Sequence, residues 1–263
     1  YFDNMPNKGY HLTGKVTYTY PSGKWYTLFL SYKYERDYKS SHSFLYRLDQ
    51  LDGWGEDSME KLGSLPSMEA YQRMLDAPNS YHSRLYEDNH QLDPFLNWQV
   101  KGAKGIWSGQ FRMPVSYKTR TLRYHRGEVD TTFTKRTILL SIYSTYANWK
   151  SNDKKKEFRI SYDVNSKAPD MNMYLNIRDT TDPLNITLGN LNLKNAYDHT
   201  VKSSLTRMYP KRQMLMGVEA EYSVSTNESA MGYSYDTKTG IRTFCPDNVN
   251  GNWQGRINLG LMT

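Results

Sequence analysis

Met214–Val224 reads MLMGVEAEYSV, and its apolar residues stand at every second position. Val218 and Tyr222 belong to the apolar set, whereas Glu219 and Glu221 lie between its members. Successive side chains of a β-strand point to opposite faces, so one face of this strand is apolar and the other is charged. The pattern predicts a strand that separates two environments of different polarity.

The same alternation recurs along most of the chain. Many of these segments are about 9 to 13 residues long. Strands of soluble proteins most often have about 5 or 6 residues, whereas a tilted strand needs about 9 to 11 to cross a bilayer. Together with Met214–Val224 they predict nine spanning strands, the first descending from outside: Tyr10–Tyr20, Trp25–Tyr34, His90–Val100, Trp107–Tyr117, Ile138–Ile142, Phe158–Val164, His199–Tyr209 and Trp253–Leu261.

Aromatic residues gather near the ends of these segments. Tyrosine and tryptophan rings are apolar in body and polar at the tip, so membrane–water interfaces select them. One predicted belt contains Tyr18, Tyr20, Tyr26, Trp98, Trp107, Tyr146, Trp149 and Tyr209. The other contains Tyr10, Tyr32, Tyr34, Tyr117, Tyr162 and Trp253.

The connections between the segments alternate between short and long. The short ones are Pro21–Gly23, Lys101–Lys104, Asn148–Lys156 and Pro210–Arg212. The long ones are Glu35–Asn89, Lys118–Asp130, Asn165–Asp198 and Thr226–Gly251. Outer-membrane barrels have tight periplasmic turns and long extracellular loops, whereas a soluble sandwich has no reason to place every long loop at one end.

Composition narrows the functional classes. The chain has 263 residues, a net charge of +7 and 38% hydrophobic residues, without a run of about 18 apolar residues that would predict a membrane-spanning helix. Cys245 is the single cysteine, so no internal disulfide is expected. The six histidines are scattered, and no nucleotide-binding or hydrolase motif occurs. We therefore expect no catalytic residues, metal site, cofactor or nucleic-acid partner.

One segment carries a family resemblance. Ile177–Val201 reads IRDTTDPLNITLGNLNLKNAYDHTV and resembles a string of the Bacteroidota outer-membrane β-barrel family of TonB-dependent receptors. The residues that match the family string are Asp182–Ile186, Gly189-Asn190, Asn192–Lys194 and His199. Leu191 replaces the usual proline, and Asn195-Ala196 replaces a Pro-Glu pair.

The resemblance implies a receptor with a barrel of 22 strands and an N-terminal plug. Residues 1–263 would be a middle-to-late part of a single transmembrane barrel domain, and the chain contains no segment that resembles the plug. Such receptors lie in the bacterial outer membrane and import a scarce nutrient. The implied partners are outer-membrane lipid, the rest of the barrel and plug, TonB acting through the plug, and a surface lipoprotein.

The long connections contain candidate binding residues. Short helices are predicted at Ser67–Leu75, capped by Ser67, and at Met171–Arg178. Aromatic and basic side chains there could stack on a sugar or porphyrin, or could pack the loops against each other. The candidates are Trp54, Tyr81, Tyr86, Tyr124, His125 and Arg126.

Charged residues on the polar side of the strands are expected to face the barrel lumen, where they meet water or the plug. They are Lys15, Arg112, Arg159, Asp163, Lys202, Glu219, Glu221 and Arg256. In a soluble cleft, Glu219 and Glu221 could act as an acid–base pair, but a lumen gives them a simpler role.

The sequence thus predicts an all-β fold: part of an antiparallel transmembrane β-barrel of a TonB-dependent receptor. Two alternatives stay open. A non-transporting outer-membrane barrel for secretion, assembly or adhesion would have no plug. A soluble cell-surface β-sandwich that binds a ligand would need no detergent. An enzyme is a more distant alternative.

Overall fold

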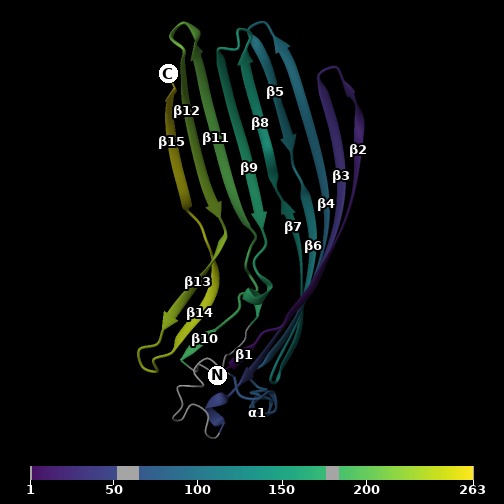
Figure 1. Ribbon diagram of the computed structural model, residues 1–263, viewed down its shortest axis with the longest axis vertical. Helices are drawn as coiled ribbons and strands as arrows, with labels where there is room; N and C mark the ends of the chain where they lie inside the picture. Colours follow the sequence, from purple (N-terminus) through teal and green to yellow (C-terminus); the bar gives the residue numbers. More distant parts are fainter. Residues whose placement is uncertain (1, 52–64, 176–183, 263) are drawn as a thin grey trace.

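The computed structural model describes residues 2–51, 65–175 and 184–262, and this part of the chain is almost entirely antiparallel β-structure. It contains a sheet of twelve strands and a second sheet of three. The all-β antiparallel fold predicted from the alternating pattern is therefore confirmed. Figure 1 shows the long strands of the large sheet running side by side, with the small sheet at one end.

The large sheet contains β1 (Phe2–Asn4), β2 (Asn7–Gly23), β3 (Tyr26–Tyr46), β4 (Tyr81–Gly102), β5 (Gly105–Arg112), β6 (Val115–Arg126), β7 (Val129–Leu140), β8 (Ile142–Ser151), β9 (Lys156–Lys167), β11 (Ala196–Tyr209), β12 (Met214–Thr226) and β15 (Asn252–Met262). The small sheet contains β10 (Asn185–Thr187), β13 (Glu228–Tyr235) and β14 (Arg242–Val249). The helices are α1 (Met68–Gln72) and the 3₁₀ turns η1 (Leu48–Gln50), η3 (Met171–Tyr174) and η4 (Pro210–Arg212).

Nine strand paths cross the large sheet, as the sequence predicts, because two pairs of strands lie end to end. β4 pairs first with β5 and then with β6, so these two form one path interrupted near Pro114, which has no N–H for a ladder. β7 leads into β8 in the same way. Among the described strands, β2 pairs only with β3 and β15 only with β12, so these two lie at the edges.

The strand register divides the sheet into two faces of opposite polarity. On the apolar face, one row across seven strands consists of Val100, Trp107, Trp149, Phe158, Leu205, Val218 and Leu259. The adjacent row on the polar face consists of Gln99, Ser108, Asn148, Arg159, Ser204, Glu219 and Asn258. These seven strands thus place the apolar residues of this row on the same side.

A bulge in β8 reverses the alternation of that path. Ile142 pairs with Val164, but the next regular pair is Thr145 with Tyr162, and Ser144 between them has φ 51°. Two residues of β8, Tyr143 and Ser144, stand opposite the single residue Asp163 of β9. Because this adds one residue to β8, even positions face one side before the bulge and the other side after it. The prediction for Tyr146 is therefore wrong: it lies on the polar face, where the Arg159 guanidinium stacks 4.0 Å above its ring.

The short and long connections lie at opposite ends of the strands (Figure 1). The predicted long loops are, however, largely strands. β3 continues to Tyr46 and β4 starts at Tyr81, while β6 and β7 join in a hairpin at Gly127. Strands β13 and β14 occupy most of the Thr226–Gly251 connection. The prediction ended the strands where aliphatic residues stop, although the backbone pairing continues.

The predicted helices are shorter than expected. α1 covers Met68–Gln72 within the predicted Ser67–Leu75, and Ser67 stands at its N-cap without a side-chain hydrogen bond to the helix. The expected capping by Ser67 is therefore wrong. η3 covers Met171–Tyr174, and the rest of that predicted helix, from residue 176 on, lies outside the described residues.

A small hydrophobic core lies on the polar-face side of the sheet, at the end of the long connections. There the segment around η3 and Leu193 covers the extended ends of β4, β6 and β7. The buried residues of this core are Leu122, Tyr124, Met171, Tyr174, Leu175 and Leu193. Tyr81, Leu85, Phe133 and Met173 pack against them.

Gly109 tests how tightly neighbouring strands pack on the apolar face. A Cβ atom at Gly109 would clash with the Tyr146 backbone carbonyl and lie 2.7 Å from the Trp98 ring, whereas one at Gly217 would have no atom within 4 Å. We expect Gly109→Ala to lower the free energy of unfolding by about 1–3 kcal/mol because the indole and the neighbouring backbone must move. Gly217→Ala should be neutral or slightly stabilising. Urea unfolding followed by circular dichroism measures both, and equal effects would contradict this packing.

Candidate functional site

All eight predicted lumen-facing residues lie on the polar face. Lys202, Glu221 and Arg256 belong to one cross-strand row. Arg159 and Glu219 belong to the next. Lys15, Arg112 and Asp163 are placed on the same face by their pairing partners, Lys33, Phe95 and Thr200. Whether this face borders a lumen stays a prediction.

One depression on the polar face is organised by an ion pair. The Arg112 guanidinium donates from Nε to both carboxylate oxygens of Asp93, at 2.9 and 3.0 Å. Asp93 is 5% exposed. Several hydrogen bonds to one carboxylate hold the arginine side chain in a single orientation. Lys15 and Phe95 are among the other residues that line this space of about 260 Å³.

A second depression, of about 350 Å³, lies nearer the β15 edge and is lined by charges of both signs. The Lys202 ammonium lies 3.4 Å from a carboxylate oxygen of Glu221. Arg159, Glu219 and Asn258 complete its polar lining. Glu221 is paired with a cation, and both glutamates lie on the same broad polar face. This arrangement is suited to contact with water or with a polar partner.

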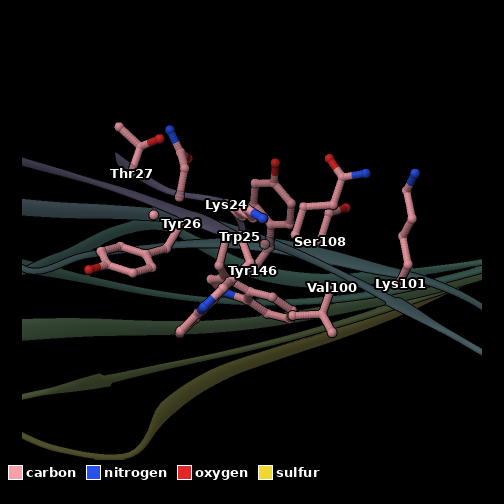
Figure 2. A pocket seen from close by; sticks show the side chains of 13 residues that line it. Lys24, Trp25, Tyr26, Thr27, Val100, Lys101, Ser108 and Tyr146 are labelled. Carbon is pink, nitrogen blue, oxygen red and sulfur yellow. The ribbon is translucent and has the colours of Figure 1, made fainter. Parts of the chain in front are cut away.

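The largest depression, about 1020 Å³, lies at the end of the short turns. Lys24 and Trp25 come from the β2–β3 turn, while Tyr146 and Ser108 come from the neighbouring strands. Figure 2 shows its side chains leaving the sheet on both sides, with Tyr26 and Val100 on the apolar face and Thr27 on the polar face. It is an opening between strand ends, and no convergent set of polar groups marks it as a ligand site.

The candidate ligand-binding residues do not form one cluster. Tyr81 and Tyr124 stack at 5.8 Å on the polar-face side, where both belong to the small core. Tyr86 and His125 point to the apolar-face side, because their pairing partners Tyr38 and His82 do. Arg126 donates a hydrogen bond to the Asn79 side chain at 3.2 Å. Trp54 lies outside the described residues.

Alternation along β6 explains the separation of these candidates. Tyr124, His125 and Arg126 are consecutive, so His125 must face opposite to its neighbours. Residues that are adjacent in the sequence of a strand therefore do not share a binding site on one face.

A buried arginine lies beneath the η3 segment. The Arg120 side chain is 5% exposed and donates from Nη1 to the Pro169 carbonyl oxygen at 2.7 Å. Burial raises the pKa of the Tyr174 phenol, and the neighbouring Arg120 opposes that rise. The Lys135 ammonium lies 4.9 Å from the centre of the Tyr174 ring. These contacts attach the η3 segment to the polar-face side of β6 and β7.

Asparagines of the 184–195 segment and of β14 have structural roles that the sequence analysis missed. Asn190 donates from its backbone N–H to the Met173 carbonyl and from its side chain to the Pro246 carbonyl, at 2.8 and 3.0 Å. The Asn248 side chain accepts from the backbone N–H of Lys194 at 2.8 Å and donates to the Asn227 carbonyl at 2.7 Å.

Gly189 permits this arrangement, because a Cβ there would lie 2.6 Å from the Leu175 backbone. The match of these residues to the family string, Gly189-Asn190 and Asn192–Lys194, indicated that the segment matters. It did not predict these hydrogen bonds. Asp182-Pro183, at the start of the same string, lies outside the described residues.

Other kinds of site are not found in the described part of the chain. No group of three or more histidine, cysteine, aspartate or glutamate side chains is placed to hold a metal ion among residues 2–51, 65–175 and 184–262. Within the same residues, no helix has the length and apolar character needed to cross a membrane.

Comparison with known proteins gives structural similarity alone. No protein-family model and no curated protein sequence matches the chain. One similar solved structure is the outer membrane transporter YddB from Escherichia coli, with 12% identity, a TM-score of 0.44, and coverage of 94% of this chain and 38% of that one. Another is the siderophore receptor PirA from Pseudomonas aeruginosa, with 9% identity, a TM-score of 0.39, and coverage of 97% and 52%.

The chain therefore spans about half or less of the length of these two proteins. Neither similar structure bears on the predicted phylum, which stays a prediction.

Asn248→Ala tests the attachment of the 184–195 segment to β14. The substitution removes an acceptor and two donated hydrogen bonds, to Lys194 and Asn227, at a local cost of about 1–3 kcal/mol. We expect faster proteolysis within 184–195 while the large sheet keeps its stability. Asn258→Ala, on the polar face of β15, is the matched control. Equal cleavage rates in both variants would show that Asn248 does not hold this segment.

Proposed function

We propose that this chain forms part of the wall of a transmembrane β-barrel in the bacterial outer membrane, and that the whole protein is a TonB-dependent receptor that imports a nutrient. The observation that carries this proposal is the exposed apolar face. Leu205, Val218 and Leu259 are neighbours in one row and are 51%, 42% and 80% exposed. Soluble proteins rarely expose a contiguous apolar face of this extent, whereas lipid chains cover it.

The height of the apolar band fits a bilayer. On β4 it extends from Val100, in the tryptophan row, to His90, which pairs with Tyr34 and Tyr117. These ten steps correspond to about 33 Å along the strand, or about 25 Å of membrane thickness at a tilt of about 40°. Trp107 at one end and Tyr117 at the other belong to the two expected aromatic belts.

The two edges support a larger closed barrel. β2 and β15 each have one pairing partner in the described sheet, so each presents unpaired backbone groups at its outer edge. Unpaired N–H and C=O groups in hydrocarbon cost several kcal/mol each, so a spanning sheet must close. Further strands of the same polypeptide, as in a 22-strand barrel, would supply the partners, and the plug would lie outside this chain.

The polar face then borders the lumen. Water or a plug would solvate Arg159, Lys202 and Glu219, which could not face lipid without a large cost. The short turns would lie in the periplasm and the long connections outside the cell. Ligand capture would fall to the outer end, where five candidates lie in the described residues: Tyr81, Tyr86, Tyr124, His125 and Arg126.

The transport step is supported by the resemblance of Ile177–Val201 to TonB-dependent receptors. In such a receptor the ligand binds at the outer end, and TonB pulls on the plug to open a path through the barrel. The residues described here would form the wall and part of the binding surface, and would perform no covalent chemistry. A surface lipoprotein that contacts the long connections is a further proposed partner.

Gel mobility and TonB binding test the proposal on the full-length protein. Outer membranes are extracted with detergent, and samples are run with and without boiling. A closed barrel should migrate faster unboiled, and immobilised periplasmic domain of TonB should retain the protein. A heat shift without retention would favour the non-transporting barrel. A protein that is soluble without detergent and shows no heat shift would favour the β-sandwich and overturn the proposal.

Adjacent substitutions in β11 test which face meets lipid. Leu205→Arg places a cation on the apolar face and should destabilise the barrel, by about 2–4 kcal/mol at the bilayer midplane and by less toward an aromatic belt. Ser204→Arg places the same group on the polar face between Glu219 and Arg159, where water and the carboxylate offset the repulsion from Arg159, and should be tolerated. Heat-shifted protein in the outer-membrane fraction is measured for both. Similar losses in the two variants would contradict the assignment of faces.

A further inference from the structure

Strands β3, β4, β6 and β7 continue beyond the tyrosine belt toward the long connections, and they keep their two faces. On the apolar-face side, aliphatic residues give way to arginine, tyrosine and histidine. We call this surface the outer extension. Its cross-strand rows contain Arg36, Asp88, Thr119 and Arg136; Tyr10, Tyr38 and Tyr86; Arg84 and Arg123; and His42, His82 and His125.

The row nearest the belt forms a shallow depression of about 630 Å³ that opens outward. Arg36 donates from Nε and Nη2 to the Asp88 carboxylate at 2.8 and 3.2 Å, and the Tyr34 hydroxyl donates to the same carboxylate at 2.6 Å. The Tyr32 hydroxyl lies 2.7 Å from Nδ1 of His90. This network holds several polar groups rigidly at the border of the apolar band.

The next row is aromatic. The rings of Tyr10 and Tyr38 lie 5.4 Å apart, and those of Tyr38 and Tyr86 lie 5.0 Å apart. Tyrosine rings offer an apolar surface with a polar tip, which suits the faces of sugar rings.

A pair of arginines follows the aromatic row. Arg84 and Arg123 are exposed and stand directly opposite each other on neighbouring strands. Like charges in this position repel and destabilise a sheet. Among the residues that the structure describes, no carboxylate lies within 4 Å of either guanidinium, and the Arg123 guanidinium stacks 5.7 Å from the Tyr86 ring. Such a pair suits an external anion.

A row of three histidines, His42, His82 and His125, lies beyond them. Burial, together with His42, Arg84 and His125, holds the pKa of the His82 imidazole below its usual value. The imidazole is therefore largely neutral near pH 7, and the arginines carry the permanent charge.

We propose that the outer extension binds the phosphorylated headgroup of a glycolipid in the outer leaflet. This inference rests on the proposed barrel, which puts the apolar band in hydrocarbon and the outer extension at headgroup level. Arg36 is occupied by Asp88, so Arg136 is the cation of that row that is open to a ligand. Arg136 and Arg123 lie four pairs apart along the strands, about 13 Å, with the tyrosine row between them. Two cationic rows on either side of an aromatic row match sugars that carry phosphates, and arginine binds phosphate in a bidentate manner.

The test uses full-length, delipidated protein in detergent, and its probes are phosphorylated lipid A and the same lipid after removal of its phosphates. Wild type should bind the phosphorylated lipid at least about tenfold more tightly. Arg84→Gln/Arg123→Gln should lose most of this preference. Lys211→Gln/Arg212→Gln removes the same charge from the exposed η4 turn at the other end and should keep it.

The outcomes separate the lipid site from the barrel. A heat-shifted wild type that binds both lipids equally, or an arginine double variant that keeps the preference, overturns the lipid inference alone. Displacement of the lipid by inorganic phosphate at equal concentration also overturns it, in favour of a free-anion site. Absence of a heat shift in wild type overturns the proposed function and the lipid site together.

If the double variant does not fold, Arg136→Gln replaces it as the test. Arg136 is exposed and pairs across the strands with Thr119 beside the depression. A folded Arg136→Gln protein should bind the phosphorylated lipid about threefold to tenfold more weakly than wild type. Unchanged affinity in this variant would overturn the inference.

Discussion

The structure depends on one constraint, the common parity of its strands. Each strand has side chains on both faces, so a shift of one residue in any register would move its charges to the apolar face. In β12, Glu219 and Glu221 would then replace Val218 and Ala220 in the exposed rows. Among the residues that the structure describes, the hydrophobic core beside η3 is small. In soluble sheets a packed interior fixes the strand register. Here the register is fixed by the different polarity of the environments on the two faces.

The nine strand paths could be predicted because this constraint requires apolar residues at every second position of the spanning strands. It also explains where the prediction failed. The outer parts of β3 and β4 keep the same backbone pairing, but residues such as Arg36, Tyr38 and Arg84 replace aliphatic ones on that face. A search for alternating apolar residues therefore ends the strand at the border of the apolar band, although the pairing of β3 with β4 continues to Ser43.

Other features depend on tertiary contacts and left no local signal. The bulge at Ser144 is visible only in the pairing with β9, so nothing in the sequence places Tyr146 on the polar face. The role of Asn248 depends on Lys194, which lies on a distant connection. The eight charged residues of the polar face were found by parity alone, whereas the ion pair of Arg112 with Asp93 required the strand register.

The parallel pairing of β10 with β14 has a consequence for cooperativity. Asn185 pairs with Arg242 although β11 and β12 intervene in the chain, so the pairing joins two connections that are far apart in the sequence. The connection after β9 and the connection after β12 share hydrogen bonds through Asn190 and Asn248, and neither can open without releasing the other. Two connections thus behave as a single cooperative unit.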